Sequence, residues 1–307
     1  MNCKFDNAFR KEDIQFFVLE NECLRLEVMN LGATVTSLQY YGKELTLRYS
    51  DPMEYLQQSA YVGAIVGRYA NRISCAKADI AGTIYQLSPN EGNNQLHGGP
   101  EGFHQKLWIA DEVSSDRLHL TTCSPDGECG YPGNLTAGVT YRLSENTLWI
   151  EFDGVSDRDT LFAPTTHMYF NLGSTSVLDA KLQINASRYM EVDSENLPVD
   201  ILPVDEVYDF RKLRKIGHNY DHCFPFDGEP LCILEDDGVR MSIRTDFPAI
   251  QVYTGEFLQA PVYKNQGIAL EPEYFPDSPN HPEYPSAVLQ KDKNFHRHIE
   301  YRFETAT

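Results

Sequence analysis

Alternation of apolar and polar residues with a period of two recurs along the chain. It is clearest at residues 24–28, 148–152, 239–243 and 299–303. This period places the apolar side chains on one face of an extended strand. Segments with a helical period are almost absent, so we predict an all-β fold, a large antiparallel β-sandwich with little helix. Residues 139–143 and 148–152, which flank the turn-forming Ser144-Glu145-Asn146-Thr147, predict a β-hairpin.

The composition is that of a globular protein with a strongly acidic surface. Of the 307 residues, 41% are hydrophobic and 23% are charged. No repeat, low-complexity tract or Ser/Gly-rich linker divides the chain, so we expect one domain over residues 1–307. A net charge of -19 repels nucleic acid and anionic membranes. A neutral small molecule is therefore the expected partner of a monomer or homodimer.

The start of the chain and the cysteines favour a cytoplasmic location. The first residues are polar and lack the apolar stretch of a signal peptide. The seven cysteines are odd in number, scattered, and without a Cys-x-x-Cys pair, which suits a reducing compartment. No window approaches the ~18 uninterrupted apolar residues of a membrane span.

Several common chemistries lack their motifs in this sequence. There is no Gly-x-x-x-x-Gly-Lys, Gly-x-Gly-x-x-Gly, His-Glu-x-x-His or Gly-x-Ser-x-Gly. No two histidines have the spacing of metal ligands within a helix, and His296-x-His298 is better explained as a solvated strand face. We therefore predict neither a cofactor nor a metal.

Two histidines lie where stability alone does not require them. His97 adjoins two glycines in Leu96-His97-Gly98-Gly99, within the Gly-rich segment 90–102. Glycines allow the backbone to approach a ligand closely, although a glycine turn with an incidental histidine is the simpler alternative. His167 interrupts the strand-like segment 164–172, where it shares a face with Tyr169. Its alternative is a histidine whose ring is satisfied by a backbone carbonyl.

Further segments carry polar groups suited to hydroxyl recognition or proton transfer. Residues 67–73 supply Arg68, Asn71 and Arg72, and a guanidinium with an amide can bind vicinal hydroxyls; alternatively the arginines are surface residues, Arg68 in particular. Asp221 precedes an aromatic residue, where it alternatively caps a turn. Glu271 follows the apolar run 267–270, so we expect a partly desolvated carboxylate at a strand end, or else one that faces water.

Together these segments resemble the galactose mutarotases, or aldose 1-epimerases. The matching segments are residues 67–73, 90–108, 164–172, 221–224, 251–255 and 270–280, and residues 30–33 and 131–135 are also similar to the family. The resemblance implies a β-sandwich with a sugar site in a cleft across one sheet. It also implies cofactor-free interconversion of the α and β anomers of an aldohexose.

The resemblance assigns roles to seven residues. Glu271 matches the general base, His167 the general acid and His97 the second histidine. The sugar-binding positions match Arg72, Asn71, Asp221 and Gln251. At neutral pH we expect Glu271 as a carboxylate and His167 as an imidazolium. Whether His97 is catalytic or mainly orients the sugar stays open, as does the preferred sugar.

One residue departs from the family pattern. We expect glutamine more often at the position of Glu273, two residues after the base. Glu273 either raises the proton affinity of Glu271 by repulsion between like charges or faces solvent.

Three other functions compete with this one. A hexose-phosphate mutarotase of the same fold would need additional basic residues, which the net charge of -19 does not favour. A glycoside hydrolase would use Asp221 and Glu271 as paired carboxylates, but it leaves both histidines without a role. A non-catalytic carbohydrate-binding module explains Arg72 and Asn71 but not the two histidines and Glu271.

Overall fold

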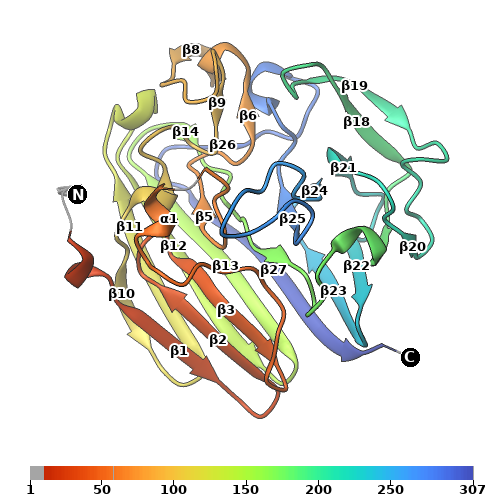
Figure 1. Ribbon diagram of the computed structural model, residues 1–307. Helices are drawn as coiled ribbons and strands as arrows, with labels where there is room; N and C mark the ends of the chain where they lie inside the picture. Colours follow the sequence, from red (N-terminus) through yellow and green to blue (C-terminus); the bar gives the residue numbers. More distant parts are fainter. Residues whose placement is uncertain (1–9, 58, 307) are drawn as a thin grey trace.

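The computed structural model describes residues 10–57 and 59–306. The start of the chain, on which the expectation about a signal peptide rests, lies outside these residues. The all-β prediction is confirmed: the described residues form strands, six short 3-10 turns and the single-turn helix α1 (Glu54–Gln57) (Figure 1). None of the helices in this part of the chain has the length and apolar character needed to cross a bilayer.

A nine-stranded sheet forms the largest layer. Its order is β10-β11-β12-β13-β27-β23-β22-β17-β20, and every neighbouring pair is antiparallel. The strands are β10 (Ile109–Val113), β11 (Arg117–Ser124), β12 (Leu135–Ser144), β13 (Thr147–Ser156), β27 (Asn294–Thr305), β23 (Val239–Thr245), β22 (Leu231–Asp236), β17 (Lys181–Ile184) and β20 (Arg214–Lys215). The predicted hairpin is confirmed as β12 and β13, with Leu143 opposite Leu148.

Two four-stranded antiparallel sheets accompany the large one (Figure 1). The first consists of β1 (Phe16–Glu20), β2 (Leu24–Met29), β3 (Thr34–Tyr40) and β4 (Lys43–Glu44). The second has the order β16-β25-β24-β21, formed by β16 (Tyr169–Phe170), β25 (Ile268–Glu273), β24 (Ala249–Tyr253) and β21 (Asp221–Pro225). This second sheet, which we call the site sheet, carries three of the predicted site residues.

Five short two-stranded pairs complete the described structure. They are β5 (Ile65–Val66) with β15 (Thr165–Thr166), β6 (Arg72–Ile73) with β9 (Gln95–Leu96), β7 (Lys77–Ile80) with β8 (Thr83–Gln86), β14 (Thr160–Leu161) with β26 (Val288–Leu289), and β18 (Arg188–Val192) with β19 (Pro198–Pro203). The pair β6 and β9 brings the Arg72 and His97 segments side by side, because Arg72 lies opposite Leu96.

The hydrophobic core follows the period-two pattern. Leu148, Ile150 and Phe152 of β13 are buried and belong to the same cluster as Ile299 and Tyr301 of the neighbouring β27. Each buried side chain of this size stabilises the fold by about 1.5–3 kcal/mol relative to its exposure.

The alternative in which Arg68 is a surface residue is wrong. Its side chain is among the largest fully buried ones. The guanidinium donates hydrogen bonds to the carbonyl oxygens of Ser124, Pro132 and Gly133, and to the hydroxyl of Thr160. Buried carbonyl and hydroxyl groups need such donors, so Arg68 joins loops from distant parts of the sequence.

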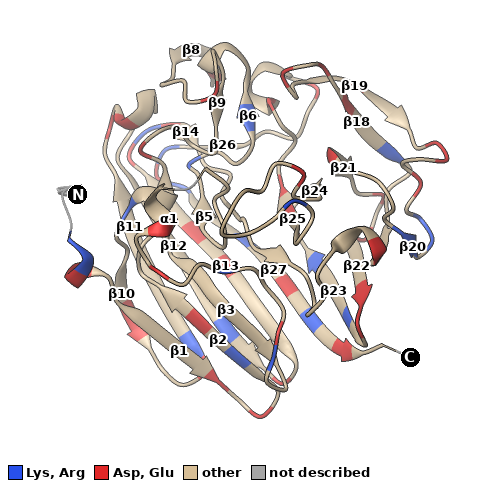
Figure 2. Ribbon diagram, in the orientation of Figure 1, with Lys and Arg blue, Asp and Glu red and all other residues tan. Residues whose placement is uncertain are grey.

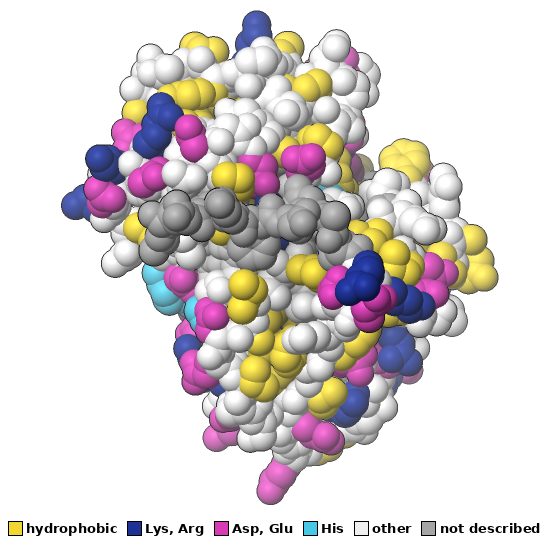
Figure 3. All heavy atoms as spheres, turned by 90° about the vertical axis from the view of Figure 1, so that its left-hand side faces the viewer, with side chains coloured by type: hydrophobic (Ala, Val, Ile, Leu, Met, Phe, Trp, Pro, Cys, Tyr) yellow, Lys and Arg dark blue, Asp and Glu magenta, His cyan; other side chains and the backbone are white. Residues whose placement is uncertain are grey.

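Charged residues are spread over the molecule. Figure 2 shows acidic residues on strands and loops of the different sheets. On the face shown in Figure 3, Lys and Arg side chains lie beside Asp and Glu rather than in a basic patch of the described residues.

Candidate active site

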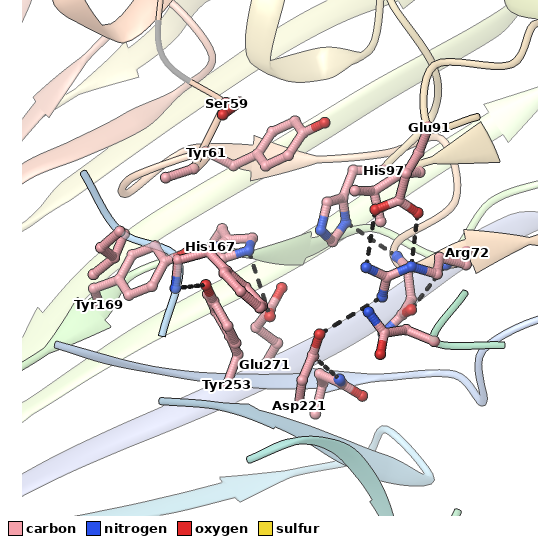
Figure 4. A pocket seen from close by; sticks show the side chains of 17 residues that line it. Ser59, Tyr61, Arg72, Glu91, His97, His167, Tyr169, Asp221, Tyr253 and Glu271 are labelled. Atoms are coloured by element: carbon pink, nitrogen blue, oxygen red, sulfur yellow. Dashed lines mark hydrogen bonds and ion pairs between the residues drawn. The ribbon is translucent and has the colours of Figure 1, made fainter. Parts of the chain in front are cut away.

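A pocket of about 330 Å³ opens above the site sheet. All seven residues that the resemblance singled out line it, namely Asn71, Arg72, His97, His167, Asp221, Gln251 and Glu271. They come from separate segments of the chain, so the fold brings them together (Figure 4). The size is within the usual range for a small-molecule site.

Strand register places the acidic and amide groups of the pocket. Gln251 of β24 lies opposite Glu271 of β25, and Asp221 of β21 lies opposite Tyr253 of β24. Because side chains alternate between faces, Asp221, Gln251 and Glu271 share the pocket face. Ile268 and Leu270 point the other way, into the core.

The position of Glu271 differs from the expectation of a partly desolvated strand end. Strand β25 continues through Pro272 to Glu273, so Glu271 lies inside the strand and is only 2% exposed. The Pro272 carbonyl accepts a hydrogen bond from the hydroxyl of Thr165, so the ring nitrogen also faces this side of β25. Strand β16 pairs only with residues 268–269 on that side, so no strand of the described chain needs the missing N–H. One side-chain oxygen of Glu271, Oε2, is buried without a hydrogen-bond partner among the described residues.

His167 lies in the break between β15 and β16. Its backbone N–H donates to the carbonyl of Ala64, and its own carbonyl accepts from Gly63. The ring stacks on Tyr61, with centroids 5.8 Å apart, and its Nε2 lies 3.6 Å from Glu271 Oε1. These contacts hold the imidazole of His167 next to the carboxyl group of Glu271, in a position to receive a proton from it (Figure 4).

His97 is fixed by a tight glycine loop. Its backbone φ is +51°, and Gly98 and Gly99 follow at +88° and +91°. A Cβ at Gly98 would lie 1.8 Å from the carbonyl oxygen of Gly67, so only glycine fits there. Asn71 N–H donates to His97 Nδ1 at 3.1 Å, so the neutral ring carries its hydrogen on Nε2.

The structure contradicts the expected imidazolium at His167. Burial lowers the pKa of His167 to about 3 and the pKa of His97 well below 6.5. Both rings are therefore neutral at neutral pH in the empty pocket. The sequence could not reveal this, because it depends on how completely tertiary contacts remove water from the rings.

The pKa of Glu271 changes in the opposite direction from that of His167. Burial is the main cause that raises its pKa well above the ordinary 4.5; a negative charge on Glu273 or Asp221 adds to the change, and Arg72 partly opposes it. Both shifts favour the state of the empty pocket in which Glu271 carries the proton and the ring of His167 is neutral. Glu271 Oε1 and His167 Nε2 lie 3.6 Å apart, which is close enough for an ion pair but longer than a hydrogen bond.

Arg72 forms the cationic side of the pocket. Its Nε and Nη2 donate to the two carboxylate oxygens of Glu91 at 2.7 and 3.0 Å, and its Nη1 lies 4.0 Å from Asp221. Asp221 also accepts from Gln251 Nε2 at 2.6 Å. This fork of donors and acceptors suits neighbouring hydroxyl groups.

Several pocket residues could not be identified from the sequence. They are Glu91 and the aromatic residues Tyr61, Tyr169, Tyr253 and Phe257. Glu91 lies in the segment 90–102 that the sequence singled out, so the loop was the available signal. Tyr169 lies on the strand face already assigned to His167, and Tyr253 lies in the matching segment 251–255. Tyr61 and Phe257 lie outside the matching segments and carried no signal.

Two histidines and a carboxyl group of the pocket lie close enough together to be considered as metal ligands. Ligand atoms of His97, His167 and Glu271 lie within 4.8 Å of one another. A metal-bound histidine normally donates its other ring N–H to an acceptor. In this pocket His97 Nδ1 faces the N–H of Asn71 instead, which leaves the hydrogen on Nε2. The donor set therefore fits proton transfer better than metal binding.

Comparison with known proteins settles the family. A family model described as aldose 1-epimerase matches residues 15–302. The chain belongs to the aldose 1-epimerase family. The resemblance inferred from the sequence is confirmed.

Curated relatives and solved structures agree with this family. The aldose 1-epimerase of Escherichia coli K12 is 34% identical over 92% of this chain and 93% of that protein. The galactose mutarotase of Mus musculus is 32% identical over 95% of each chain. A galactose 1-epimerase from Lactobacillus acidophilus superposes with a TM-score of 0.87 at 31% identity, covering 94% of each chain. Both curated relatives are isomerases by name, and the predicted enzyme class is confirmed.

The fold extends to a more distant member of the family. A homologue from Caenorhabditis elegans superposes with a TM-score of 0.92 at 26% identity, covering 96% of this chain and 100% of that one. The galactose mutarotase-like sandwich is thus the fold of this chain.

Proposed function

We propose that the protein interconverts the α and β anomers of aldohexoses such as galactose and glucose. Glu271 removes the proton of the C1 hydroxyl, His167 protonates the ring oxygen, and His97 donates its Nε2–H to the sugar. The observation that carries this proposal is the approach of Glu271 Oε1 to His167 Nε2, 3.6 Å apart with both side chains buried.

The reaction requires only proton transfers. Loss of the C1 hydroxyl proton and protonation of the ring oxygen break the bond between C1 and the ring oxygen and give the open aldehyde. Rotation about the C1–C2 bond then presents the other face of the carbonyl for closure. No electrons leave the sugar and no group is transferred. Each positioned acid or base typically contributes about 10²–10⁴ in rate.

The one proton held by Glu271 and His167 provides both roles. Its transfer from Glu271 to His167 produces the carboxylate and the imidazolium that ring opening needs. Glu271 then takes the proton of the C1 hydroxyl while His167 gives its proton to the ring oxygen. Ring closure reverses both transfers, so the pair ends with one proton as it began.

The remaining predicted residues position the sugar. Arg72, Asn71 and Gln251 supply donors, and Asp221 supplies an acceptor, for ring hydroxyls. Tyr169 and Tyr253 line the same pocket and provide flat apolar surface for the C–H face of a sugar.

The three alternatives fit the pocket less well. Glu91, Asp221 and Glu271 line it together with Arg72, so carboxyl groups outnumber guanidinium groups among its described residues. This charge disfavours a phosphorylated hexose. A glycoside hydrolase or a binding module does not use the contact of His167 with Glu271.

Polarimetry of freshly dissolved α-galactose tests the proposal. The protein should accelerate the approach to the equilibrium rotation without consuming sugar. A parallel assay with an aryl galactoside should release no reducing sugar. Unchanged relaxation with the protein present would reject mutarotation, and sugar release would favour the hydrolase.

A further inference from the structure

Glu273 is a second buried carboxyl group beside the proposed base. It follows Glu271 by two residues on β25, so both side chains share one face. Glu273 is 0% exposed and lies opposite Ala249 of β24. The alternative in which Glu273 faces solvent is therefore wrong.

The contacts of Glu273 differ from those of Glu271. Its Oε1 accepts a hydrogen bond from Asn71 Nδ2 at 2.8 Å, and its Oε2 is buried with no hydrogen-bond partner in the described part of the chain. The residues that line the pocket include Glu271, which has His167 beside it, but not Glu273. A sugar in the pocket could exchange a proton with Glu271 but not with Glu273.

Within residues 10–57 and 59–306, the charges around Glu273 leave it without a cation of its own. The charged and titratable groups near it are Glu271 on the same strand, Asp221 and Cys223 on β21, Arg72 on β6 and Tyr69 just before β6. Arg72 is already bound to Glu91 by two hydrogen bonds. Burial raises the pKa of Glu273 well above its ordinary value, and the hydrogen bond from Asn71 opposes the change. When Glu271 becomes a carboxylate during the proposed reaction, an ionised Glu273 on the same face of β25 would place a second negative charge beside it in a buried site, which is unfavourable.

We propose that Glu273 keeps its proton at neutral pH and acts as a positioning residue. In this neutral form its carbonyl oxygen holds the Asn71 side chain in place, while Glu271 alone exchanges protons with the sugar. The role of Glu271 in this statement rests on the proposed function. A protonated glutamate has nearly the shape of glutamine and the same neutral carbonyl acceptor for Asn71. This accounts for a glutamate where the resemblance leads us to expect glutamine.

Asn71 transmits this positioning to two pocket residues. Its N–H donates to His97 Nδ1 at 3.1 Å, and its Oδ1 accepts from the N–H of Arg72 at 2.8 Å. Loss of the carbonyl acceptor at Glu273 would free the Asn71 amide and loosen the ring of His97 and the start of β6.

Infrared difference spectroscopy tests the protonation state without any sugar. At neutral pH, Glu273→Gln should remove a carbonyl band of a protonated carboxyl group from the wild-type spectrum. The matched control Glu20→Gln, which removes a carboxyl group with 64% side-chain exposure, should leave that band unchanged. Loss of a carboxylate band instead of the carboxyl band in Glu273→Gln would overturn the proposal.

Kinetics of two variants test the positioning role. Glu273→Gln should keep kcat and KM within about threefold, because a neutral amide and a neutral acid are equivalent at this position. Glu273→Ala should raise KM by about tenfold with a smaller change in kcat, since Asn71 loses its acceptor. A loss of more than about tenfold in kcat for Glu273→Gln would refute the positioning role. If the wild-type protein does not catalyse mutarotation, the proposed function fails, and the infrared result still decides the state of Glu273.

Discussion

At the scale of single residues, the chemistry depends on burial more than on residue type. The sequence correctly predicted that Glu271, His167 and His97 would meet in one pocket, because their segments match the motifs of one family. It could not predict that burial makes the His167 ring neutral and gives Glu271 the shared proton. Removal of water is a property of the packed structure, not of a motif.

The shared proton predicts a pH profile for kcat. As pH falls toward the lowered pKa of His167, about 3, the pair gains a second proton, Glu271 cannot become a base, and the rate falls. As pH rises through the raised pKa of Glu271, the pair loses its only proton, no acid remains, and the rate falls again. Polarimetric rates corrected for spontaneous mutarotation should therefore give a bell-shaped profile.

The acid side of this profile is the informative one. Activity should persist well below the ordinary histidine pKa of about 6.5. A fall in kcat centred near that value would show that His167 titrates as an ordinary histidine and does not share its proton with Glu271. His167→Asn provides the control, with a rate lower by about 10²–10⁴ across the range.

At the scale of elements, the glycine loop and the short strands set the geometry. The glycine run after His97 was recognised from the sequence, and the structure shows why alanine does not fit at Gly98. Strand β25 was expected to end at Glu271 but continues to Glu273. Proline in a sequence pattern argues against continuation of a strand, but Pro272 turns its nitrogen and carbonyl toward Thr165, beyond the end of β16, where no strand among the described residues needs an N–H.

Gly98→Ala should destabilise the protein more than a matched substitution elsewhere. Gly98 and Gly82 have similar φ values, +88° and +83°, but a Cβ at Gly98 meets the Gly67 carbonyl at 1.8 Å while one at Gly82 meets nothing within 4 Å. Gly82→Ala should cost about 1–2 kcal/mol from the left-handed backbone alone. Gly98→Ala should cost at least about 2 kcal/mol more and lower kcat by displacing His97.

Urea unfolding and kinetics of both variants measure these effects. Equal losses of unfolding free energy in the two variants would show that the close approach of Gly98 to Gly67 does not constrain the loop.

At the scale of the whole molecule, acidic residues outnumber basic ones both in the whole sequence and among the residues that line the pocket. The sequence predicted a neutral substrate from a net charge of -19, and the pocket repeats this excess with Glu91, Asp221 and Glu271 beside Arg72. Glu91 could not be singled out because a loop glutamate is ordinarily a solvated surface group. The overall sandwich was predictable because period-two alternation persists through β13, β23 and β27.

Glucose 6-phosphate should therefore be a poorer substrate than glucose. We expect kcat/KM to be lower by at least about tenfold at low ionic strength, and the difference to shrink as salt is added. The 6-O-methyl ether of glucose serves as the control for size without charge. Equal or higher kcat/KM for the phosphate would instead support the hexose-phosphate mutarotase.

The proposed reaction depends most directly on Glu271 as the acceptor of the C1 hydroxyl proton. Glu271→Gln keeps the shape and hydrogen-bonding reach of the side chain but cannot accept that proton. Equilibrium binding of galactose and polarimetric turnover should be measured on one preparation of the variant. We predict nearly normal binding with a loss of at least about 10² in kcat, whereas a variant that binds sugar and retains most of its turnover would contradict this role of Glu271.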